Sequence, residues 1–95
     1  MFLCSKLTLL DRYSEFAVKN YPDIDNELLF VLIQASLFSE TGISIKDLVD
    51  CLGITYQTLT KRLKTVREKN LLVEKIQGKR KYFELDISLL DKSMI

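Results

Sequence analysis

The sequence predicts a mainly α-helical domain with a small β-hairpin, an α+β fold in the order helix, helix, helix, helix, strand, strand. Three observations predict it. Apolar residues recur at helical spacing through the first two thirds of the chain, residues suited to N-caps precede those segments, and the period changes to two after Asn70. A chain of 95 residues is expected to form one domain, residues 1–95.

The first two predicted helices lie on either side of Pro22. Between residues 3 and 17 the apolar side chains form one helical stripe. Pro22 is expected to end this helix, and Asp23 or Asp25 to cap the next. The second helix, near residues 26–39, is apolar almost all round, which predicts that it is the buried central helix of the core.

Two shorter helices should follow Gly42, the expected stop of the second helix. Ser44 and Asp47 match a capping box for a helix that reaches Leu52. That helix is expected to bury Leu48, Val49 and Cys51. After Gly53, Thr55 is the expected N-cap of a fourth helix ending near Lys69.

Alternation of apolar and polar residues begins after Asn70, which stands where a left-handed residue can end the fourth helix. Two alternating segments flank residues 77–80 and predict a hairpin with Gly78 in its turn. Residues 43–45 are expected to add a short third strand at the hairpin edge. A short helical turn is expected at Ile87, Leu89 and Leu90.

The third and fourth helices, joined by a tight turn at Gly53, form a predicted helix-turn-helix. On the fourth helix, Leu59, Leu63 and Val66 make one apolar stripe, and the opposite face is polar. Because the N-terminal part of such a helix meets base edges in the major groove, this polar face is the candidate DNA-reading surface. Its expected contacts are Thr55, Tyr56, Gln57, Thr60, Lys61, Arg62 and Lys64, with Arg62 nearer the core and suited to a phosphate.

Charge is distributed unevenly along the chain, although the net charge is only +1. Residues 1–50 carry four Lys or Arg against eight Asp or Glu, and residues 51–95 carry ten against five. A basic half is typical of a surface that faces a polyanion. The hairpin tip adds three further expected DNA contacts beside the predicted recognition helix: Lys79, Arg80 and Lys81.

Several other kinds of chemistry have little support in the sequence. The chain has no His, so a Ser-His or Cys-His pair is impossible, and it has no Gly-rich phosphate loop. We therefore expect no catalytic residues, no cofactor and no metal site. Cys4 and Cys51 do not form a disulfide framework, and no long apolar run predicts a membrane span, so a cytoplasmic protein is expected. For Cys51, a buried structural role is favoured over a redox role.

Four segments together resemble the winged helix-turn-helix regulators of the MarR and ArsR types: residues 48–55, 59–63, 70–72 and 78–85. The resemblance covers about residues 43–86. It implies a homodimer that reads a pseudo-palindromic site with its recognition helix in the major groove and its hairpin as a wing. The chain departs from the MarR pattern in having only nine residues after Asp86 in place of a long C-terminal helix, and Asn70 replaces the usual Gly.

Surplus apolar residues in the N-terminal helix, residues 1–22, predict that it forms the dimer contact. The expected interface residues are Phe2, Leu3, Leu7, Leu10 and Phe16; the alternative is that this helix merely covers Phe30 and Leu37 of its own chain. The function expected is a homodimeric transcriptional regulator that binds double-stranded DNA. The alternatives are a plasmid or virus DNA-binding protein for partition or replication, and a winged-helix module that binds proteins.

Overall fold

The computed structural model describes the backbone of residues 2–94 and the side chains of residues 7–93. It is a mixed α+β fold of five helices and a three-stranded antiparallel sheet within that range. The elements follow in the order α1 (Phe2–Asn20), α2 (Asn26–Phe38), β1 (Ile43–Ser44), α3 (Ile45–Leu52), α4 (Tyr56–Glu68), β2 (Leu72–Gln77), β3 (Arg80–Leu85) and α5 (Ile87–Met94).

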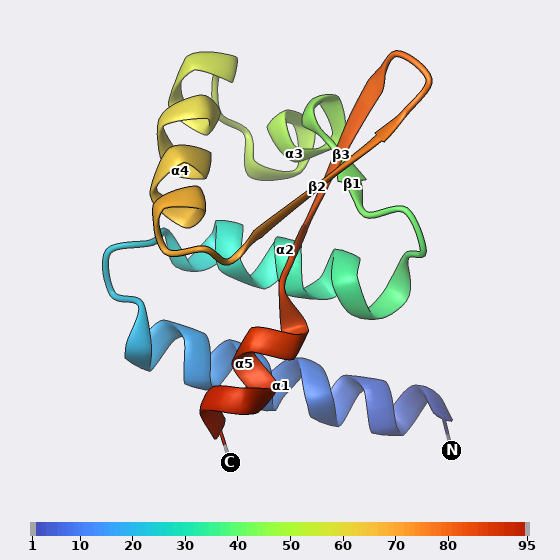
Figure 1. The fold of residues 1–95 in the computed structure, drawn as a ribbon, viewed down its shortest axis with the longest axis vertical. Helices are drawn as coiled ribbons and strands as arrows, with labels where there is room; N and C mark the ends of the chain where they lie inside the picture. The colour runs from blue at the N-terminus through green and yellow to red at the C-terminus, as the bar shows by residue number, and fades with distance from the viewer. Residues whose placement is uncertain (1, 95) are drawn as a thin grey trace.

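The elements are arranged in tiers around α2 (Figure 1). Helices α1 and α5 lie below α2, and α3, α4 and the hairpin tip lie above it. The fully buried side chains include Leu28, Leu29, Leu32 and Ile33, all from α2. Leu48 of α3, Leu59 and Val66 of α4, Leu85 of β3 and Leu90 of α5 pack into the same core. The core therefore joins all five helices and the sheet.

The predicted helix caps are confirmed. Asp25 caps α2 by accepting from the Leu28 amide, Ser44 caps α3 through the Asp47 amide, and Thr55 caps α4 through the Thr58 amide. At the other end of α4, Asn70 has the expected left-handed backbone, with φ of 62°. These positions were predictable because caps are local hydrogen bonds within a few residues.

The hairpin and the third strand are also confirmed. β2 pairs with β3 from Leu72 opposite Leu85 to Gln77 opposite Arg80, and Ile43 of β1 lies opposite Phe83 on the other side of β3. The sheet order is thus β1-β3-β2. Gly78 is first in the two-residue connection, with φ of 62°, where a type II′ turn favours glycine.

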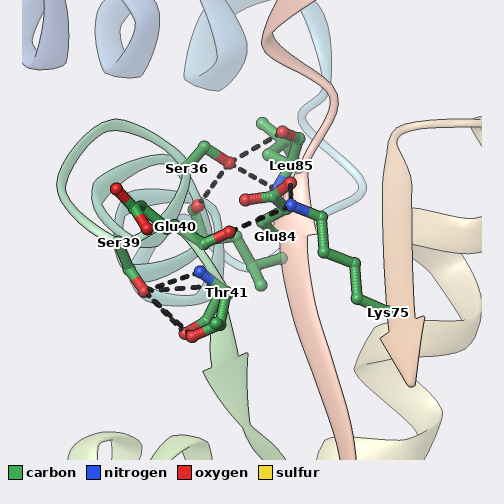
Figure 2. A network of polar contacts seen from close by, with 9 residues as sticks. Ser36, Ser39, Glu40, Thr41, Lys75, Glu84 and Leu85 are labelled. Carbon is green, nitrogen blue, oxygen red and sulfur yellow. Dashed lines mark hydrogen bonds and ion pairs between the residues drawn. The ribbon is translucent and has the colours of Figure 1, made fainter. Parts of the chain in front are cut away.

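Gly42 does not end α2, contrary to the expectation. The helix ends at Phe38, and Ser39 is its C-cap. The Ser39 hydroxyl then accepts from the amides of Thr41 and Gly42 and holds the loop that leads into β1 (Figure 2). Gly42 instead has φ of 90°, and a Cβ there would lie 2.7 Å from the Phe83 carbonyl oxygen. Its absence of a side chain is what allows the chain to approach β3.

Ser36 connects the central helix to the sheet (Figure 2). Its hydroxyl lies 2.7 Å from the Leu85 carbonyl oxygen and accepts from the Leu85 amide at 2.9 Å. Lys75 of β2 forms an ion pair with Glu84 and donates to the Glu40 carbonyl oxygen. These polar contacts hold the lower end of the hairpin against the loop after α2.

Two burial predictions are wrong. Helix α2 is not buried all round, because Phe30 and Phe38 are 43% and 40% exposed and Gln34 is also exposed. Cys51 is exposed rather than buried. In a helix at about 100° per residue, Leu48, Val49 and Leu52 lie on one side, whereas Cys51 is rotated away from their centre. A periodic pattern gives the width of the apolar stripe but not how much of it other elements cover.

The C-terminal segment forms an eight-residue helix, α5, where only a short turn was expected. Asp86 begins it by accepting from the Leu89 amide. Leu90 is fully buried, and the Tyr13 hydroxyl of α1 donates to the Asp91 carboxylate. Packing against α1 therefore stabilises a helix that is too short to be stable alone.

Tyr13 makes the α1–α5 contact sensitive to alkaline pH. Burial, the hydrogen bond to Asp91 and the charge of Asp91 raise the pKa of Tyr13 from 10.0 to about 12. The neutral phenol is favoured in the folded state, so this stabilisation is complete below pH 10 and is lost as pH rises through 12. We expect it to fall by about 2 kcal/mol between pH 8 and 11.5.

Tyr13→Phe tests this expectation by urea unfolding at pH 8 and pH 11.5. At pH 8 the variant should be about 1 kcal/mol less stable because it lacks the hydrogen bond. At pH 11.5 the difference should shrink or reverse, since only the wild type has this phenol to ionise. A constant difference at both pH values would contradict the assignment.

Candidate nucleic-acid interface

The site begins with the outer face of α4. Leu59, Leu63 and Val66 hold its inner face in the core, each at most 4% exposed. Gln57, Thr60, Lys61 and Lys64 are exposed on the other side. Tyr56, in the first turn, is 60% exposed. The helix therefore has one anchored side and one side that is open to a partner.

The hairpin tip lies at the same end of the molecule as the N-terminus of α4, with α3 between them (Figure 1). Lys79, Arg80 and Lys81 are exposed at this tip. The structure thus places two of the predicted groups at one end of the molecule, although the last member of the first, Lys64, stands 15 residues before Lys79 in sequence. We call the exposed side chains of α4, of the start of α3 and of the hairpin tip at this end of the molecule the basic face: Tyr56, Gln57, Thr60, Lys61, Lys64, Lys79, Arg80 and Lys81, together with Lys46.

Ion pairing divides the basic residues of the C-terminal half into two sets. Four are paired with carboxylates: Arg62 with Asp25, Arg67 with Glu74, Lys69 with Asp23 and Lys75 with Glu84. Within the described residues, Lys61, Lys64, Lys79, Arg80 and Lys81 form no ion pair. Lys92 of α5 also forms no ion pair with a described residue, but α5 lies on the other side of α2 (Figure 1). The other five unpaired cations of this half lie on the outer face of α4 and at the hairpin tip, within the basic face.

Three of the residues predicted to contact DNA form contacts within the folded chain: Arg62, Thr55 and Thr60. Arg62 lies 3.3 Å from Asp25, the N-cap of α2, so its guanidinium is held at the junction of α4 and α2. The Thr55 hydroxyl caps α4, and the Thr60 hydroxyl donates to the Tyr56 carbonyl oxygen at 2.9 Å. Sequence periodicity places these residues near the polar face, but their partners come from the folded chain.

Lys46 is a member of the basic face that the sequence reasoning missed. A cleft of about 400 Å³ lies between the start of α3 and β3, and Lys46, Arg80 and Lys81 line it together with Ser44, Ile45 and Asp47. No other described residue forms an ion pair with Lys46. The sequence did contain a feature that could have identified Lys46. A third strand was predicted at residues 43–45, and a strand there at the hairpin edge places Lys46 beside the hairpin.

The expected dimer residues that the structure describes differ in how far they are exposed. Leu7 is 49% exposed, but Leu10 is 6% exposed and packs in the core of its own chain, and Phe16 is half-buried against that core. Leu10 is therefore corrected from an interface residue to a core residue, because α1 directs it toward α2. Phe2 and Leu3 lie outside the described side chains. Around Leu7 the exposed surface of α1 carries Asp11, Arg12 and Glu15.

No group of three or more His, Cys, Asp or Glu side chains in the described part of the chain is placed to hold a metal ion. None of the helices described is both long and apolar enough to cross a bilayer. A comparison with known protein families and with curated proteins finds no match to this chain.

Proposed function

We propose that this is a cytoplasmic, sequence-specific protein for double-stranded DNA, a winged helix-turn-helix that acts as a homodimeric regulator of transcription. The observation that carries the proposal is the basic face, where the unpaired cations of α4, α3 and the hairpin lie at one end of the fold. A phosphate backbone is the partner that such a surface fits best, because each neutralised phosphate releases counterions.

The shape of the basic face favours a duplex. Helix α4 has 13 residues, is anchored along one side and presents its first turn at the end of the molecule, as a helix entering a major groove must. The hairpin extends beside it and carries Arg80, a residue suited to the negative potential of a narrow minor groove. Lys46, at the cleft between the start of α3 and β3, is placed to meet the phosphates that separate the two grooves.

Binding of a random-sequence duplex, measured by fluorescence anisotropy at several salt concentrations, tests the proposal. With about six cations on phosphates, the plot of log affinity against log salt should have a slope near −5, from about −0.9 per contact. Binding that is absent at low salt, or that salt does not weaken, would contradict DNA recognition and would favour the protein-interaction alternative.

Gln57 is the expected base-reading residue. It lies in the first turn of α4 and is exposed, and its side chain has no hydrogen bond with any other described residue. A Gln amide can pair with adenine through two hydrogen bonds. Gln57→Ala should therefore cost about 1–3 kcal/mol on the preferred site, which is found by selection from random DNA, and little on random DNA. Equal losses on both would contradict base reading.

A further inference from the structure

Among the described residues, one side of α2 carries two exposed aromatic side chains. Helix α2 has 13 residues, of which only Asn26 and Glu27 at its start, and Gln34 and Ser36 further on, are strongly polar. Its inner side is fully buried, yet Phe30 and Phe38 remain 43% and 40% exposed. Exposed aromatic residues in one strip are characteristic of an interaction surface.

This strip is nearly symmetric about Gln34. Phe30 and Phe38 stand four residues before and after it, and the half-buried Val31 and Leu37 stand three before and three after. At about 100° per residue, Phe30 and Phe38 flank Gln34 by about 40° on opposite sides, and Val31 and Leu37 by about 60°. Gln34 is thus the centre of the exposed strip both along the helix and around it.

We propose that the occupant of this strip is a second copy of the chain, with the two α2 helices packed antiparallel about a two-fold axis through Gln34. In such a contact residue i meets residue j and residue j meets residue i. Phe30 then lies opposite the partner's Phe38, and Val31 opposite the partner's Leu37. The Gln34 amides, which both donate and accept, are self-complementary at the axis.

A hollow beside the strip gives the partner's side chains room to enter. It has a volume of about 310 Å³ and is lined by residues of α2, of the loop after it and of α3: Val31, Gln34, Ala35, Phe38, Ser39, Gly42, Ile43 and Cys51. Four of these, Val31, Gln34, Ala35 and Phe38, have the i, i+3, i+4, i+7 spacing that forms a hole for a side chain of a facing helix.

The contact is expected to be modest in size. Thirteen residues at 1.5 Å each make a strip about 20 Å long, which is at the low end of specific interfaces even with the α3 contribution. We therefore expect a dimer with a dissociation constant of tens of micromolar.

Glu27 is exposed near one end of the strip and Glu40 lies just beyond the other, so antiparallel pairing brings acidic ends together. The dimer should accordingly become tighter with added salt, the opposite of DNA binding.

The proposed pairing would also place the basic faces of both copies on the same side of the dimer. Only this consequence depends on the proposed function. Ser36 of α2 bonds to Leu85 of β3, and Gln34 lies about 160° around the helix from Ser36, so the strip faces away from β3. In Figure 1, β3 crosses α2 on the near side, α1 lies below α2, and α3 and α4 lie above it. A vertical two-fold axis behind α2 then makes the two helices antiparallel and carries both basic faces to the same side. One duplex can meet both copies.

Sedimentation equilibrium without DNA tests the dimer, with Phe30→Glu and Leu7→Glu as matched variants. Both replace an apolar side chain of similar exposure, 43% and 49%, by a carboxylate. Phe30→Glu should raise the dissociation constant at least about 30-fold, the loss typical of an aromatic anchor, and Leu7→Glu should not. Circular dichroism of both variants must show a folded chain; if Phe30→Glu is unfolded, Gln34→Lys takes its place.

A Gln34→Cys variant with Cys4 and Cys51 changed to Ser provides the second measurement. Mild oxidation should join two chains covalently through residue 34, whereas Glu15→Cys in the same background should form no covalent dimer. A monomer at 200 µM, set about tenfold above the expected dissociation constant, would overturn the proposal. So would a dimer that Leu7→Glu disrupts and Phe30→Glu does not, or one that salt dissociates. None of these outcomes depends on DNA binding, which the anisotropy measurement tests separately.

Discussion

Gly42→Ala is expected to lower the free energy of unfolding by about 3–4 kcal/mol, one of the largest effects of a single methyl group in this fold. The backbone of Gly42 has φ of 90°, which L residues rarely adopt, and the new Cβ would lie 2.7 Å from the Phe83 carbonyl oxygen. The atom that it meets belongs to the backbone of the central strand, so the clash is relieved only by moving β1 away from β3.

Gly53→Ala provides the matched control. Gly53 also has a positive φ, 63°, but a Cβ there would meet nothing within 4 Å. It should lose only about 1 kcal/mol, the cost of the left-handed conformation alone. Thermal unfolding followed by circular dichroism measures both, at roughly 4–8 °C per kcal/mol for a domain of this size. Equal losses for the two variants would contradict the close approach of Gly42 to Phe83.

The second large effect concerns DNA. Replacing Lys46, Arg80 and Lys81 together with Ala should weaken binding of any duplex by roughly 100-fold or more near 100 mM salt, and should flatten the salt slope by almost 3. These three cations line the cleft between α3 and β3. The loss should be the same for specific and random DNA, because phosphate contacts carry no sequence information.

The control removes the same charge from the opposite end of the molecule. Arg12 and Lys19 of α1 and Lys92 of α5 are exposed, and α1 and α5 lie below α2, away from the basic face (Figure 1). Changing these three to Ala should alter binding at most a fewfold. Similar losses for the two triple variants would show that net charge, rather than the arrangement of the basic face, determines binding.

The local features of this fold were predictable because local bonds make them. The caps at Ser44 and Thr55 and the left-handed Asn70 follow from side chains and backbones a few residues apart. The hairpin follows from alternation around Gly78, and the exposed side of α4 follows from its narrow apolar stripe. The charge distribution likewise indicated which half of the chain is basic.

The sequence by itself thus determined where the helices and strands lie, which side of α4 is anchored and which half of the chain is basic. Only the tertiary structure decided which charges remain unpaired, because the carboxylates that pair with Arg62 and Lys69 come from residues about 40 positions away. It also decided that Lys46 lies in the basic face, that Leu10 belongs to the core and that α2 has an open side. Each of these depends on which elements cover one another, and a periodic pattern along one helix holds no information about its neighbours.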